Sequence, residues 1–146
     1  MELRITELLT QRFQEALSIK DKPQKNDFSL VLGKVDEAAL QSRLQSMIDQ
    51  ITLQGKKISD HMDIKDVREY RTLIASFITE IITHSHKFSR DNFLDKRGRH
   101  RVYGIVRLID QNLDELAQEL LKSEKNHLNI LELMGDIRGL LLDILI

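Results

Sequence analysis

Apolar residues return every three or four positions along most of the chain, which is the spacing of a buried face on an α-helix. The rhythm is strongest in three segments, residues 64–88, 102–120 and 126–145, and strand-like alternation is not sustained. The three stripes consist of Val67, Tyr70, Ile74, Phe77 and Ile81; of Val102, Val106, Ile109, Leu113, Leu116 and Leu120; and of Ile130, Met134, Ile137, Leu141 and Ile144. The pattern predicts an all-α protein.

The first half of the chain carries two weaker stripes. Residues 2–18 place Ile5, Leu9 and Phe13 on one helical face, and residues 20–27 hold the single proline and almost no apolar side chain. We therefore expect a helix, then a linker, and a short lead-in at residues 28–33. A further stripe runs through Leu40, Leu44, Met47, Ile51 and Ile58.

Polar residues mark where these helices begin. Asp36 and Asp63 each precede an apolar stripe and are typical helix N-caps, because a carboxylate accepts hydrogen bonds from the first unpaired amides. The last helix is expected to begin at about Asn126. Gly55 lies inside the stripe that follows Asp36 and weakens the prediction of a continuous helix there.

Short connections between long amphipathic helices make sequential neighbours antiparallel. We therefore expect residues 35–146 to form an up-and-down four-helix bundle. The domain division that we predict is an amphipathic N-terminal arm with its linker, residues 1–30, followed by the helical bundle, residues 31–146.

Composition places the protein in the cytoplasm and argues against several kinds of partner. Among 146 residues there are 22 basic and 23 acidic side chains, a net charge of -1, so the molecule has no overall field that attracts nucleic acid. Cysteine is absent, which excludes disulfides and thiolate metal sites. The charged N-terminus lacks the apolar core of a signal peptide, and we expect no membrane span.

One segment concentrates positive charge. The sequence DKRGRHRVYG contains Lys96, Arg97, Arg99, His100, Arg101 and Tyr103. If Gly98 adopts a positive φ, this turn can present backbone amides, arginine forks that match phosphate oxygens, and a tyrosine ring for stacking. The alternative is an exposed corner between two helices, whose charge Asp91 and Asp95 neutralise.

The sequence proposes no catalytic or metal site, and we expect neither an enzyme nor a bound cofactor. His84 and His86 point to opposite sides of a helix, so they do not chelate one ion. The acidic residues fall mostly opposite the apolar stripes, whereas di-iron bundles need inward-facing glutamates. No nucleotide-binding loop, zinc-protease motif or nucleophile elbow occurs.

The C-terminal helix is apolar almost all round and contains Gly135 and Gly139, one turn apart. Two small residues at this spacing let another backbone approach closely. The neighbour is either another helix of the same bundle or a second protein chain, since a small bundle rarely covers a helix on all sides.

Three stretches, DVREYRTLIASFITEII, DKRGRHRVYGIVRLIDQNLDEL and IRGLLLDIL, in this order, resemble the YaaR family of small bacterial proteins, a domain of unknown function. The resemblance spans about residues 35–146. It implies an all-helical bundle in the cytoplasm and supplies no activity, substrate or catalytic residue.

We expect a non-enzymatic helical interaction or regulatory module. Its partner is an unknown protein, or a second copy bound through the apolar C-terminal helix or the N-terminal arm. The alternative function is binding of a phosphate ligand or RNA by the basic segment Lys96–Arg101, although the missing basic surface and aromatic residues argue against sequence-specific nucleic-acid binding.

Overall fold

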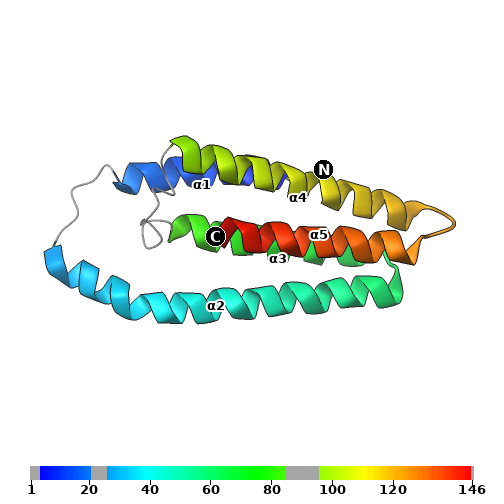
Figure 1. The fold of residues 1–146 in the computed structure, drawn as a ribbon, viewed down its shortest axis with the longest axis horizontal. Coiled ribbons are helices and arrows are strands. Elements are labelled where there is room, and N and C mark those ends of the chain that lie inside the picture. The colour runs from blue at the N-terminus through cyan, green and yellow to red at the C-terminus, as the bar shows by residue number, and fades with distance from the viewer. Residues whose placement is uncertain (1–3, 21–25, 85–95, 146) are drawn as a thin grey trace.

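The computed structural model describes the backbone of residues 4–20, 26–84 and 96–145, and the side chains of residues 4–14, 39–84 and 97–144. The described residues are almost entirely helical, which confirms the all-α prediction (Figure 1). The helices are α1 (Ile5–Lys20), α2 (Asn26–His61), α3 (Lys65–Thr83), α4 (Lys96–Leu121) and α5 (His127–Leu145).

Helices α2 to α5 form the expected up-and-down bundle (Figure 1). Neighbours along the chain run antiparallel: α2 packs on α3, α4 packs on α5, and α5 returns to contact α2. Arg43 in α2 pairs with Glu80 near the end of α3, as this arrangement requires. The apolar stripes predicted for the last three helices are buried, so the periodicity located the core correctly.

Helix α1 joins this core instead of standing apart as an arm. It lies along α3 and α4, and Ile5, Leu9 and Phe13 are each at most 2% exposed. The burial follows from the stripe itself, since three large apolar side chains on one face gain several kcal/mol, roughly 2 each, when they leave water. Residues 21–25, in the predicted linker, lie outside the described residues.

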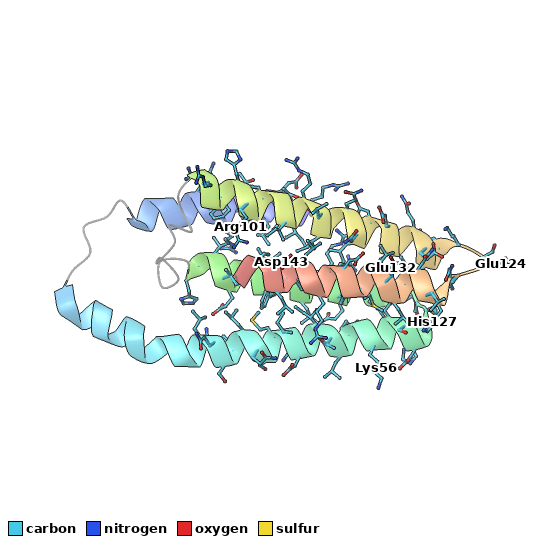
Figure 2. The ribbon with its side chains drawn as sticks, in the orientation of Figure 1. Lys56, Arg101, Glu124, His127, Glu132 and Asp143 are labelled. Atoms are coloured by element: carbon cyan, nitrogen blue, oxygen red, sulfur yellow. The ribbon has the colours of Figure 1, made fainter. Side chains whose placement is uncertain are left out.

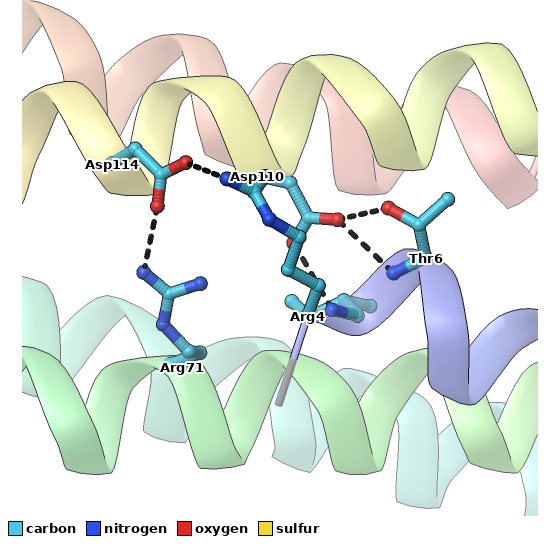
Figure 3. Close-up of polar contacts among 6 residues, drawn as sticks. Arg4, Thr6, Arg71, Asp110 and Asp114 are labelled. Atoms are coloured by element: carbon cyan, nitrogen blue, oxygen red, sulfur yellow. Dashed lines mark hydrogen bonds and ion pairs between the residues drawn. The ribbon is translucent and has the colours of Figure 1, made fainter. Parts of the chain in front are cut away.

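A buried carboxylate holds the beginning of α1 (Figure 3). Asp110 of α4 is 1% exposed and accepts hydrogen bonds from the backbone N–H groups of Ile5 (3.1 Å) and Thr6 (3.0 Å). The Thr6 hydroxyl donates to the same carboxylate. The first amides of a helix have no partner within the helix. Asp110 therefore acts as an N-cap supplied by another helix.

One turn further along α4, Asp114 links three helices (Figure 3). It pairs with Arg4, just before α1, at 3.0 Å, and with Arg71 of α3 at 3.3 Å. The Arg71 side chain is 10% exposed and the Asp114 side chain is 40% exposed. The two aspartates thus fix both the position of α1 and its register against α3 and α4.

Helix α2 begins earlier than the sequence predicted. It starts at Asn26, so the expected N-cap, Asp36, and the predicted domain boundary at residue 31 both fall within the helix. The physical reason is that no proline follows Pro23, so each later residue keeps the N–H that a helix needs. Gly55 does not interrupt the helix; it is buried against Met134 and Tyr70.

The N-cap of α3 is Ile64, one residue after Asp63, the predicted N-cap. Met62 has a positive φ of 56°, which ends α2 in the left-handed conformation common after helices. The Asp63 carboxylate then accepts a hydrogen bond from the backbone N–H of Lys65 at 2.9 Å. The Asp63 carboxylate therefore lies at the start of α3 without being its N-cap.

The connection between α4 and α5 depends on Glu119. Its carboxylate accepts hydrogen bonds from the Lys122 ammonium (2.7 Å) and from the backbone N–H of Asn126 (2.9 Å). The Asn126 side chain in turn accepts from the N–H groups of Leu128 and Asn129, at 3.1 and 3.2 Å, and caps α5. These contacts confirm that the last helix begins beside Asn126.

We expect Asp110→Ala to lower the free energy of unfolding by about 3 kcal/mol, because it removes the cap of α1 and leaves buried N–H groups without an acceptor. Urea unfolding followed by circular dichroism measures the change. Gln111→Ala, at an exposed position beside it, should change the value by less than about 0.5 kcal/mol. Equal effects of the two substitutions would contradict the capping role.

Acid should weaken the α4–α5 connection. The hydrogen bond from Lys122, and then that from the Asn126 N–H, lower the pKa of Glu119 below its ordinary value of 4.5, although burial acts in the opposite direction. A group whose pKa is lower in the folded state stabilises the fold above its unfolded pKa. That stabilisation disappears as the pH falls through the folded-state pKa.

The stability difference between the wild type and Glu119→Gln should therefore be largest near neutral pH and should shrink as the solution is acidified below pH 4.5. Urea unfolding at a series of pH values measures it. Glu124→Gln, in the same connection, is the control. A difference that stays constant with pH would show that the Glu119 charge is not what holds the connection.

Candidate functional site

The basic segment is part of a helix and not a loop. Lys96 to Arg101 form the first turns of α4, and no described glycine has a positive φ, so the expected turn at Gly98 is wrong. The reason is that arginine and lysine are good helix formers and one glycine costs only about 1 kcal/mol. Arg97 and His100 are exposed and Arg99 is half-buried; the Lys96 side chain lies outside the described residues.

Two residues of this segment hold the fold together. Arg101 donates hydrogen bonds to the backbone carbonyls of Asp143 (2.8 Å) and Ile144 (3.4 Å), in the last turn of α5 (Figure 2). A cation there satisfies unpaired carbonyls and offsets the helix dipole. The Tyr103 ring packs against Phe13 of α1, with 5.3 Å between ring centroids. Binding of an anion by Arg97, Arg99 and His100 stays a prediction.

The histidines contact individual polar neighbours. His84 lies 3.2 Å from Glu80 near the end of α3, and His127 lies 3.2 Å from the Ser59 hydroxyl. Within the described part of the chain, no three histidines or carboxylates gather into a possible metal site. Sequence reasoning missed one Glu-x-x-His sequence, Glu124 to His127, but Glu124 is exposed between α4 and α5 (Figure 2).

Helix α5 has an open face, formed by Leu128, Leu131, Gly135, Gly139 and Leu142. The three leucines are 74%, 44% and 41% exposed, and a Cβ added at either glycine would meet no atom within 4 Å. Close packing at the two glycines therefore does not occur among the described residues. The opposite face of α5 is buried in the core.

Grooves of opposite charge flank the open face. Between α5 and α2 lies a groove of about 230 Å³ whose charged lining residues are Lys56 and Arg138. Between α5 and α4 lies a groove of about 380 Å³ that Glu115, Glu132 and Asp136 line, together with the paired Glu119 and Lys122. Figure 2 shows Lys56 on α2 and Glu132 on the side of α5 that faces α4. An apolar strip with one basic and one acidic edge is what a protein contact uses for affinity and orientation.

Among the residues that the structure describes, no helix combines the length and the apolar character needed to cross a membrane.

Residues 6–145 match the family described as Protein of unknown function (DUF327). Over 102 residues, 70% of each protein, the chain is 28% identical to the uncharacterized protein YaaR of Bacillus subtilis (strain 168). The crystal structure of the uncharacterized protein BH1478 from Bacillus halodurans is similar with a TM-score of 0.71 at 33% identity, over 84% of this chain and 100% of that one. The chain therefore belongs to the DUF327 family, as its resemblance to the YaaR proteins predicted.

Proposed function

We propose that the protein is a non-enzymatic interaction module that associates with a second copy of itself through the open face of α5. The observation that carries the proposal is the uncovered strip of leucines around Gly135 and Gly139, on a helix whose other side is fully packed. Exposed apolar strips of this kind usually mark contacts with another protein. The two glycines let a second helix come close enough for backbone contact.

The charges beside the strip favour a second copy as the partner. Arg138 and Glu132 are about 120° apart around the helix axis, on opposite edges of the open face. A two-fold axis parallel to α5 places the basic edge of each copy opposite the acidic edge of the other. The interface therefore contains two such edge contacts. Each contact thus pairs Lys56 and Arg138 with the side that carries Glu115 and Glu132.

The described side chains offer little support for catalysis. The one Ser–His contact joins Ser59, which is 7% exposed, to His127, and no described carboxylate bonds to that imidazole. A nucleophile has to reach its substrate and its base has to be oriented by a third group. We interpret the pair as a link between α2 and α5, and the protein as a binding module.

We expect the wild type to change from monomer to dimer as its concentration rises from micromolar to near-millimolar. Replacing both glycines by glutamine (G135Q with G139Q) should weaken the dimer at least about tenfold, because the side chains keep the two helices apart. Sedimentation velocity and light scattering measure the association. A wild type that stays monomeric throughout would refute the proposal.

Gly104 provides a matched control for the glutamine substitutions. It is also exposed on a helix and has no atom within 4 Å of an added Cβ, but it lies on α4. Gly104→Gln, Gly135→Gln and Gly139→Gln should each slightly raise the stability of the monomer, by up to about 0.5 kcal/mol, since glutamine is a better helix former than glycine. Only the two on α5 should affect dimerisation.

A charge exchange tests the orientation of the two copies. Arg138→Glu and Glu132→Arg should each weaken the dimer, because each places like charges opposite one another. The double variant should regain part of the lost affinity, and the effects should shrink at high salt. No recovery in the double variant would contradict the two-fold arrangement parallel to α5.

A further inference from the structure

A cleft lies on another side of the molecule, among α1, α2 and α3. Its volume is about 650 Å³, within the range of small-molecule sites. Four arginines line it, two from the region of α1 and two from α3, next to three hydroxyl side chains and an apolar base. In full, the lining consists of Arg4, Ile5, Leu8, Arg12, Met47, Arg68, Arg71, Thr72, Ala75, Ser76, Thr79 and Glu80.

Positive charge exceeds negative charge in this cleft. Its one lining carboxylate, Glu80, pairs with Arg43 and His84, which are outside the lining set. Behind the cleft, Asp114 pairs with both Arg4 and Arg71 (Figure 3). Arg68 is exposed and has no ion-pair partner among the described residues. The cleft therefore attracts anions.

The geometry suits a phosphate group in particular. A guanidinium presents a planar fork of N–H donors that matches two phosphate oxygens, and several forks can surround one tetrahedral anion. Arg71 is only 8% exposed and is oriented by its contact with Asp114, so part of the cluster is fixed before any ligand arrives. Ser76 and Thr79 add hydroxyl donors on the same side of α3.

The apolar lining of the cleft indicates what kind of group is attached to the phosphate. Leu8, Met47 and Ala75 form an apolar surface beside the arginines, one residue from each of the three helices. A bare inorganic anion leaves this surface exposed, whereas a compound with a compact apolar group covers it. The cleft thus offers both parts of a site for a small organic phosphate.

We propose that this cleft binds a small organic phosphate, with the phosphate among Arg4, Arg12 and Arg68 and the organic group against Leu8 and Met47. The site goes beyond the dimer contact and does not depend on it, since none of its lining residues belongs to α5. Because α1 supplies one wall, the ligand bridges α1 and α3. Binding therefore stabilises the docked position of α1.

Phenyl phosphate is a suitable probe, with inorganic phosphate and benzoate as partial analogues. Isothermal titration calorimetry and thermal unfolding of the full chain at low salt should show binding of phenyl phosphate and an increase in Tm. Inorganic phosphate should bind more weakly because it lacks the apolar group, and benzoate because it lacks the tetrahedral anion. Absence of phenyl phosphate binding, or equal affinity for either analogue, would overturn the assignment.

Arg68→Glu should weaken phenyl phosphate binding at least about tenfold, because it replaces a charge-assisted donor by a repelling carboxylate. Its exposed position means that the fold should be retained, which circular dichroism checks. Arg107→Glu is the matched control, since Arg107 is exposed on α4 and does not line the cleft. If Arg107→Glu weakens binding as much as Arg68→Glu, the effect is one of net charge and the proposed site is wrong.

Discussion

The hydrogen bonds from the first amides of α1 to the buried Asp110 carboxylate are the contacts on which the arrangement of the structure depends. A carboxylate without partners in an apolar core costs several kcal/mol, and so do buried amides without acceptors. Each group offsets the cost of the other. Burial of the apolar face of α1 favours docking but does not fix its position along α3 and α4. The hydrogen bonds to Asp110 fix that position. With α1 in that register, Arg4 reaches Asp114, and the arginine cleft has both of its walls.

The bundle thus has two differently constructed sides. On one side, α1 covers α3 and α4 and brings arginines from distant parts of the chain together. On the other side, none of the described residues forms such a cover over α5, and its exposed leucines and glycines lie between edges of opposite charge. A small bundle rarely buries a helix that is apolar almost all round. The uncovered strip is a direct consequence of that geometry.

Periodicity in the sequence was sufficient to predict the all-α fold, the antiparallel order of α2 to α5, and most of the core. It was sufficient because burial of every third or fourth residue is a local property of a helix. The predicted start of α2 was wrong because a weak apolar stripe does not define where a helix begins. The predicted turn at Gly98 was wrong because a single glycine among good helix formers does not end a helix. Arg101 and Tyr103 were predicted to bind a phosphate and to stack on a base. Their contacts with the end of α5 and with Phe13 were not predicted, because these partners are remote in sequence.

The arginine cleft left no local signal in the sequence. Arg4 and Arg12 are followed by Arg68 and Arg71 only after more than fifty residues, and nothing in the spacing indicates that they meet. The strip on α5 was different, because Gly135 and Gly139 are one helical turn apart and their spacing is visible in the sequence. What could not be predicted was that none of the described helices would cover them.

The capping of α1 by Asp110 also has a consequence for how the polypeptide acquires its shape during translation. Ile5 and Asp110 are separated by 105 positions, so the ribosome releases α1 long before the carboxylate that will hold it exists. Through that interval the first amides of the nascent α1 are hydrated and its apolar face is uncovered, a condition that favours aggregation. Closing so long a loop is slow. Helix α1 is accordingly among the last elements to reach its final position, although it precedes α4 in the chain.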